Sequence, residues 1–195
     1  MYVYIHIPFC SNICKYCDFP KLLYDKKFVN KYLDALEKEI KERYKDEEII
    51  SIFIGGGTPT SLDCVELNKL LDIISIFKVK EKIEFTIESN VEGLTDEKIK
   101  LLKKYGVNRI SLGVQSFNDN ILKELNRSHT KDDVFKVVDK IKNNGIENIS
   151  IDYIYGIDND IEKIKKDMNI FLELIAPFIF IFYQLLRIIC VLSWI

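Results

Sequence analysis

The sequence lacks an excess of charge of either sign. Its 28 Lys and Arg residues nearly balance 30 Asp and Glu residues, for a formal net charge of −2. Most basic residues lie on amphipathic stretches such as 31–48, where they alternate with acidic ones as on the solvated face of a helix. We therefore expect no nucleic-acid partner.

The sequence also lacks the features of a secreted, disulfide-rich protein. Met1 leads directly into a strand pattern, without a basic segment or a small-residue cleavage site, so we expect no signal peptide. Five cysteines are an odd number, which disfavours a framework of paired disulfides. These observations favour the reduced cytoplasm as the location and metal binding as the role of clustered thiols.

Short runs rich in Ile, Val, Phe and Tyr alternate with longer segments of helical periodicity. The predicted strands cover 2–7, 49–54, 82–89, 107–114 and 148–156, with a possible sixth at 176–185. The predicted helices cover 27–44, 64–77, 95–106, 132–145 and 161–174. This alternation predicts an α/β protein with a parallel sheet, either an open doubly wound sheet or a partial (β/α) barrel.

Residue types typical of helix ends support these boundaries. Thr95 and Thr130 precede acidic residues at two predicted helix starts, where an N-cap belongs. Gly106 and Gly145 follow two predicted helices, where a C-terminal glycine belongs.

Unusual residues gather where the predicted strands end. In chain order they are the three cysteines after the first strand, the segment GGGTPT (55–60), Glu88, the segment GVQSF (113–117) and Asp152. Because the carboxyl ends of parallel strands meet at one edge, this order predicts a functional site there.

Cys10, Cys14 and Cys17 have C-x-x-x-C-x-x-C spacing. A structural zinc site would need four ligands, and the distant Cys64 and Cys190 form no second pair. A redox or catalytic thiol needs only one or two cysteines. An iron–sulfur cluster fits better, and three thiolates would leave one iron open to a small molecule. The alternative is that the three cysteines have this spacing by chance.

The other candidates each have an ordinary structural explanation. The segment 55–60 would suit close approach of the backbone to a ligand or simply a tight turn, and it lacks the lysine of a phosphate loop. Glu88 could accept from an ammonium group or lie on the surface. Arg127 by itself would be a solvated residue at a helix end. His6 and His129 are expected in a strand and a helix-start turn, not as ligands.

The segment HIPFCSNICKYCDF (6–19) resembles the cluster-binding motif of the radical S-adenosylmethionine (radical SAM) superfamily. It is most similar to the branch that contains the oxygen-independent coproporphyrinogen III oxidases and related heme chaperones. The likeness continues through IFIGGGTPTSL, TIESN, NRISLGVQSFND, LNRSHT and ISIDYIYGI, over about residues 2–157. It implies a partial (β/α)6 TIM-type barrel with parallel strands inside and helices outside.

The resemblance implies that Cys10, Cys14 and Cys17 hold a [4Fe-4S] cluster. Its fourth iron would bind the amino and carboxylate groups of SAM, and an electron from the reduced cluster would break a C–S bond of SAM. The implied SAM contacts are Gly56, Gly57, Thr58 and Glu88 at the amino end, Gln115 and Asp152 at the ribose, Arg127 at the carboxylate, and Tyr4 and Tyr16 beside the cluster.

Two features favour the heme-chaperone branch over the oxidases. The oxidases carry a further cysteine two positions after the third one, where this chain has Phe19, and they have a longer segment before the first strand. We therefore expect a protein that binds heme or a porphyrin and delivers heme to a hemoprotein. Radical decarboxylation of coproporphyrinogen III is the alternative, so whether the chain is an enzyme stays open.

We expect one radical SAM core domain over 1–195, family-like over about 2–185, with an atypical tail at 186–195 and without the family's C-terminal domain. The run 174–195 is almost wholly apolar. A membrane anchor there would carry Arg187 at a cost of about 2.5–3.5 kcal/mol, so a buried last strand is favoured. An inactive, truncated remnant is a third possibility.

Overall fold

One six-stranded parallel sheet forms the centre of the computed structural model, which describes residues 1–157, 161–174 and 180–184. Its strands are β1 (Tyr2–Ile7), β4 (Ile49–Gly56), β5 (Val79–Asn90), β6 (Arg109–Gln115), β7 (Asn148–Tyr155) and β8 (Phe180–Gln184). The strands β2 (Phe9–Cys10) and β3 (Leu22–Leu23) form a separate two-stranded ladder.

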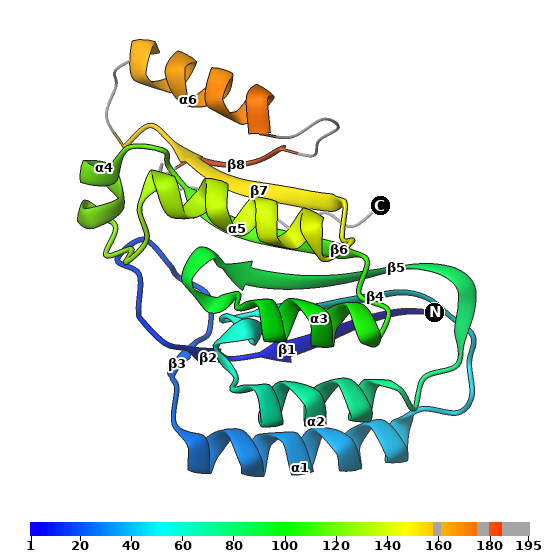
Figure 1. Cartoon of the computed structure of the whole chain (residues 1–195). Helices are drawn as coiled ribbons and strands as arrows, with labels where there is room; N and C mark the ends of the chain where they lie inside the picture. Colours follow the sequence, from blue (N-terminus) through cyan, green and yellow to red (C-terminus); the bar gives the residue numbers. More distant parts are fainter. Residues whose placement is uncertain (158–160, 175–179, 185–195) are drawn as a thin grey trace.

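Helices connect the strands and lie on one side of the sheet. They are α1 (Lys26–Arg43), α2 (Cys64–Ile74), α3 (Asp96–Lys104), α4 (Asp119–Glu124), α5 (Lys131–Asn143) and α6 (Ile161–Leu174). Figure 1 shows α1, α2, α3, α5 and α6 in chain order along that side. Among the described helices, none is both long and apolar enough to cross a membrane.

Strand order decides between the two architectures that the alternation allowed. The strands follow one another across the sheet as β1, β4, β5, β6, β7 and β8, which is also their order in the chain. A doubly wound sheet reverses its order at a switch point, whereas a barrel does not. The partial (β/α)6 barrel is therefore confirmed. The sixth strand lies within 176–185 as predicted; 175–179 and the expected tail at 186–195 lie outside the described residues.

The two faces of the sheet differ in chemistry. On the outer face, under the helices, strand residues such as Ile54, Ile87 and Leu112 are fully buried. Each such side chain contributes about 1.5–3 kcal/mol on burial, so this face sets the register. The inner face carries polar side chains instead, among them Glu88 and Asp152. A ligand site can therefore lie on the inner face without competing with the core.

The predicted helix ends are confirmed. The Thr95 side chain accepts from the backbone N–H of Lys98, and Thr130 and Asp133 cap each other's backbone at the start of α5. Gly106 and Gly145 have φ of +87° and +80°, the left-handed conformation that ends a helix. The short helix α4 was not predicted.

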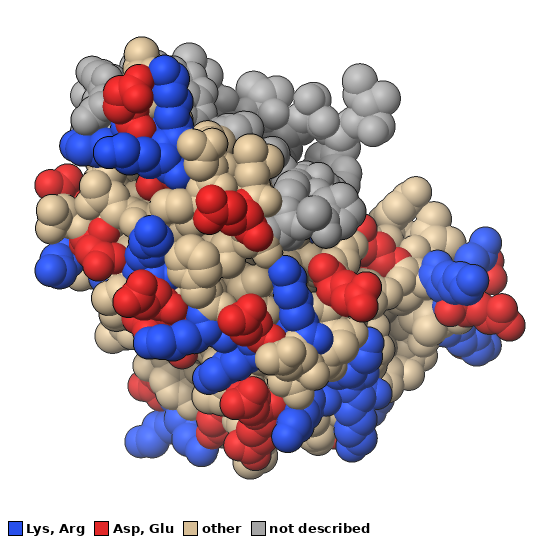
Figure 2. All heavy atoms as spheres, turned by 45° about the horizontal axis from the view of Figure 1, so that its top comes forward, with Lys and Arg blue, Asp and Glu red and all other residues tan. Residues whose placement is uncertain are grey.

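The surface over the helices carries both signs of charge. On the face in Figure 2, Lys and Arg side chains are interspersed with Asp and Glu. Several pairs bridge adjacent turns of α1, such as Arg43 with Glu39 at 3.1 Å. This pattern matches the amphipathic periodicity of the sequence.

Candidate functional site

The cysteine loop, residues 10–21, follows β1 and lies at the carboxyl-terminal edge of the sheet. Its base is closed by the β2–β3 ladder, in which the N–H of Leu22 donates to Pro8 O at 2.7 Å. The N–H of Tyr24 donates to Cys10 O at 2.8 Å. The segments on either side of the loop, 8–10 and 22–24, are thus held together by backbone hydrogen bonds.

The tip of the cysteine loop is bound to the segment after α4. Asn12 Nδ2 donates to Asn126 O at 2.7 Å, and Asn126 Nδ2 donates to Ile13 O at 2.8 Å. The N–H of Lys15 donates to Leu125 O at 3.3 Å. Asn126 adopts φ of +61°, a conformation that asparagine tolerates better than most residues. Hydrogen bonds therefore hold the loop both at its base, on the β2–β3 ladder, and at its tip, on the segment after α4.

The three thiols have different surroundings. Cys10 is buried and receives the Thr58 hydroxyl at 3.6 Å, whereas Cys14 and Cys17 are half-buried. Burial raises the pKa of Cys10, and the Thr58 hydrogen bond opposes that rise. Cys14 Sγ lies 3.4 Å from Arg127 Nη1. The thiolate is the form of cysteine that binds metals.

Within the residues that the structure describes, no three His, Cys, Asp or Glu side chains lie close enough to share one metal ion. The role of the three thiols as cluster ligands remains a prediction from their motif.

The segment Gly55–Thr58 lies against β1 and β5 with no room for side chains at its glycines. A Cβ at Gly55 would lie 2.8 Å from the Glu88 carboxylate, and one at Gly57 would lie 2.8 Å from the Pro8 backbone. The backbone N–H groups are used within the protein: that of Gly56 donates to Glu88 at 2.9 Å, and those of Gly57 and Thr58 donate to the first strands. The glycines thus bring this backbone close to the cysteine loop.

Glu88 and Asp152 are carboxyl groups on the inner face. Burial raises the pKa of Glu88 to about 7, although the Gly56 N–H opposes the rise and Asp152 adds to it. Burial also raises the pKa of Asp152 to about 6, and a hydrogen bond from Ser111 opposes that rise. Neither carboxyl has an ion-pair partner within 4.0 Å among the described residues. Two such carboxyls are suited to an added cation or hydroxyl donor.

Gln115 and Arg127 each keep one buried polar atom without a protein partner in the described structure, Gln115 Oε1 and Arg127 Nε. Gln115 has φ of +72° at an irregularity between Gly113 and Gln115, where the pairing with β7 shifts by one residue. Buried polar groups are normally satisfied. These two atoms therefore point to a ligand with a donor for the glutamine oxygen and an acceptor for the arginine.

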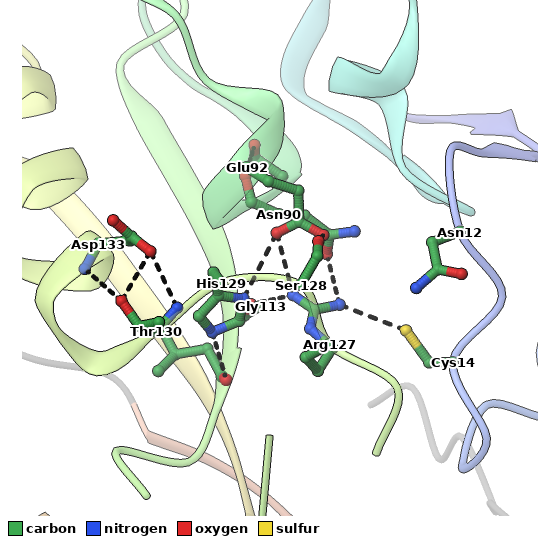
Figure 3. A network of polar contacts seen from close by, with 12 residues as sticks. Asn12, Cys14, Asn90, Glu92, Gly113, Arg127, Ser128, His129, Thr130 and Asp133 are labelled. Carbon is green, nitrogen blue, oxygen red and sulfur yellow. Dashed lines mark hydrogen bonds and ion pairs between the residues drawn. The ribbon is translucent and has the colours of Figure 1, made fainter. Parts of the chain in front are cut away.

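Arg127 lies at the centre of a polar network (Figure 3). Its Nη1 donates to Asn90 Oδ1 at 2.9 Å, and its Nη2 donates to Gly113 O. Glu92 lies 4.0 Å from Nη2 and 3.4 Å from His129 Nδ1. Burial alone would raise the pKa of Glu92, yet His129 and Arg127 together lower it to about 2. This network holds the guanidinium beside Cys14.

The sequence analysis missed Asn90 and Glu92 as members of the site. Both follow Glu88 at the end of β5 and resemble loop residues in the sequence. His129 was expected in a helix-start turn and does precede α5, but it is buried and its Nε2 donates to Val114 O over 3.2 Å. Their position directly after Glu88, at the end of β5 and in the segment that follows it, was the only available signal.

The remaining candidates lie at the border of the site. The Tyr4 ring is stacked on Phe53, and its hydroxyl lies 3.0 Å from His6 Nδ1. Tyr16 is half-buried in the cysteine loop, and burial raises its pKa. Phe19 is 47% exposed. Cys64 starts α2 away from these groups, and Cys190 lies outside the described residues.

Comparison with known sequences matches residues 4–170 to the model of the Radical SAM superfamily. A heme chaperone HemW of Lactococcus lactis is 43% identical over 186 residues, which cover 94% of this chain and 49% of that protein. A HemW of Bacillus subtilis is 42% identical, over 89% of this chain and 47% of that protein. The chain thus spans about half the length of these curated relatives.

Relatives named as oxidases are more distant. An oxygen-independent coproporphyrinogen III oxidase of Salmonella typhimurium is 31% identical over 80% of this chain and 35% of its own length. The solved structure of coproporphyrinogen III oxidase (HemN) from Escherichia coli, a radical SAM enzyme, superposes with a TM-score of 0.84 at 28% identity, covering 93% of this chain and 44% of that one. The family match, the strand order and the cysteine loop agree: this chain belongs to the radical SAM superfamily.

Proposed function

We propose that this chain forms the [4Fe-4S] cluster- and SAM-binding part of a heme chaperone. The observation that carries the proposal is the contact of the cysteine loop with Arg127, together with two buried polar atoms that have no partner among the described residues, Gln115 Oε1 and Arg127 Nε. The three thiols would hold the cluster, and the two atoms would meet SAM. When bound, the cluster supplies an open iron site for SAM and an electron.

Each end of SAM would meet a group of suitable charge. Arg127 would hold the carboxylate, because its Nε is free within the described structure while its other nitrogens are engaged. Glu88 would accept from the ammonium group beside the Gly56–Thr58 backbone. A bound cation there favours the ionised carboxylate, against the effect of burial.

The ribose would lie between Gln115 and Asp152. An amide and a carboxylate offer acceptors for two neighbouring hydroxyls. Tyr4 and Tyr16 would border the site at β1 and at the cysteine loop. We further infer that 1–195 form one radical SAM core domain, family-like over about 2–185, and that the protein works in the cytoplasm.

Heme delivery to a hemoprotein is proposed from the relatives, since the proteins of higher identity are named heme chaperone HemW. Phe19 supports this branch, because the oxidases resembled here carry a cysteine at its position. The chain covers about half of those relatives, so heme binding can also draw on segments that they have beyond it. The proposal predicts binding of heme in a titration followed by absorbance.

Radical oxidation of coproporphyrinogen III is the second candidate, favoured by the likeness to HemN. The experiment is anaerobic reconstitution of the cluster, followed by incubation with SAM, a reductant and coproporphyrinogen III. We expect no protoporphyrinogen IX. Its accumulation would overturn the chaperone proposal and establish the oxidase.

Cluster ligation can be tested on single cysteines. Cys14→Ala should lose most of the iron and sulfide, because a three-thiolate site has no spare ligand, whereas Cys64→Ala should retain both. Iron and sulfide analysis of the anaerobically reconstituted proteins measures this. In the wild type, the EPR signal of the reduced cluster should change on addition of SAM. A signal that ignores SAM would contradict an open iron site.

A further inference from the structure

A row of polar side chains runs along the inner face of β6 and β7, below the rim residues. On β6, Arg109 and Ser111 alternate with the buried Ile110 and Leu112 of the outer face. On β7, Ser150 precedes Asp152 on the inner side in the same way. The whole of β6 is buried, so these polar groups are inside the barrel.

These side chains form a continuous hydrogen-bond chain, here called the inner-face chain: Arg109, Ser150, Ser111 and Asp152. Arg109 Nη2 donates to Ser150 Oγ at 3.0 Å, and Ser150 Oγ donates to Ser111 Oγ at 3.1 Å. Ser111 Oγ donates to Asp152 Oδ1 at 3.3 Å. The chain therefore leads from a buried cation to a candidate ligand carboxylate.

The two ends of the inner-face chain determine its direction. A guanidinium can only donate, and an ionised carboxylate can only accept. Each serine hydroxyl must then accept from the Arg109 side and donate towards Asp152. This ordered arrangement is complete only while Asp152 is ionised, because a protonated carboxyl would compete as a donor.

The other partners of Arg109 do not fully compensate its positive charge. Its side chain is 8% exposed, and it lies 3.6 Å from Glu84, whose side chain is 50% exposed. It also donates to the Thr86 hydroxyl at 3.3 Å, while its Nε has no partner in the described structure. A buried arginine with one solvated carboxylate nearby keeps positive charge to act on other groups.

The charged groups around Asp152, within the described residues, come from three elements. Glu88 on β5 disfavours its ionisation, while Arg109 on β6 and Arg127 after α4 favour it. Burial is the largest influence and raises the pKa of Asp152 to about 6. Loss of one of these two cations would raise the pKa of Asp152 further.

We propose that Arg109, acting through Ser150 and Ser111, is a positioning residue that keeps Asp152 ionised and oriented to accept hydroxyl groups of a ligand. The inference rests on the proposed function for the identity of that ligand, the ribose of SAM. The orientation of Asp152 itself does not depend on SAM.

The test is the binding of SAM to the reconstituted full chain at pH 6.5 and 8.5. Arg109→Gln should weaken binding about threefold at pH 6.5, for a rise of about one unit in the pKa of Asp152 from about 6, and should recover most of it at pH 8.5, where Asp152 is ionised in both proteins. Arg109→Lys should restore binding in part. In an Asp152→Asn background, Arg109→Gln should add nothing, since it acts through the carboxylate. The surface variant Arg43→Gln is the matched control.

Equal losses at both pH values, additive with Asp152→Asn, would overturn the proposal. If Arg109→Gln fails to fold, Ser111→Ala breaks the chain while keeping the charge, and should weaken binding about threefold. Unchanged binding in Ser111→Ala would then overturn it.

A second measurement separates this proposal from the proposed function. Carbon-13 NMR of the Asp152 carboxyl, without SAM, should show a higher pKa in Arg109→Gln than in the wild type. An unchanged titration refutes the role of Arg109 even if SAM binds. Failure of the wild type to bind SAM, with the shift present, refutes only the proposed function.

Discussion

Two groups of carboxyls are treated in opposite ways by the fold: Glu92, whose side chain is 25% exposed, and the half-buried Glu88 and Asp152. Glu92 faces the Arg127 guanidinium and the His129 ring, which lower its pKa to about 2 against the effect of burial. Glu88 and Asp152 have no ion-pair partner within 4.0 Å among the described residues, and burial raises their pKa values to about 7 and 6. We call the first the closed cluster (Glu92, Arg127, His129) and the second the open pair (Glu88, Asp152).

The difference indicates what each group is for. In the closed cluster, Arg127 and His129 compensate the Glu92 carboxylate, and the cluster holds the Arg127 guanidinium beside Cys14. The open pair leaves its charges unbalanced, which reduces the stability of the ligand-free protein. Such unpaired groups are typical of sites that bind a complementary ligand.

The largest expected effect comes from opening the closed cluster. Glu92→Gln leaves Arg127 and His129 without their carboxylate and should reduce the free energy of unfolding by about 3 kcal/mol at pH 7. The lowered pKa means that this stability is present above about pH 4.3 and is lost only as the pH falls towards 2. Urea denaturation measures it, and Glu39→Gln on the surface should change stability by less than about 0.5 kcal/mol.

The next effect on stability has the opposite sign and comes from removing the charge of Glu88, one member of the open pair. Between about pH 4.3 and 7 the folded protein holds a proton on Glu88 that the unfolded chain has released, so stability falls as the pH rises through this window. Glu88→Gln should therefore be more stable than the wild type at pH 8 by about 2 kcal/mol and equal to it near pH 4. Thermal unfolding without SAM is the measurement. A loss at pH 8 would show that Glu88 belongs to the closed cluster instead.

The smallest effect concerns the second partner of Glu92. His129→Gln removes a ring whose two nitrogens face Val114 O and Glu92, and should cost about 1 kcal/mol. The matched control is Ser128→Ala, whose exposed hydroxyl lies 3.3 Å from Glu92 and should matter less. Equal losses in the two variants, by urea denaturation, would mean that the cluster does not depend on the imidazole.

Much of the fold could be predicted from local pattern. Alternating and continuous apolar runs predicted all six strands of the sheet, since the outer face under the helices requires them. The strand β5 begins at Val79, three residues before the prediction, because its polar start carries no apolar signal. The helix α4 has six residues and too few turns for a periodic pattern.

The site was predictable where residues form a motif and not where they meet only in space. Cys10, Cys14 and Cys17 share one short segment, and Gly56–Thr58 share another. Glu92 and Arg127 are 35 positions apart, with α3, β6 and α4 between them, and no local pattern links them.

The sequence by itself determined the alternation of strands and helices, the helix caps and the cysteine spacing, because each depends on neighbours a few residues away. Only the tertiary structure decided the strand order, which separates a barrel from a doubly wound sheet. It also decided which carboxyls are paired and which are not, since a pKa depends on burial and on charges brought near by folding.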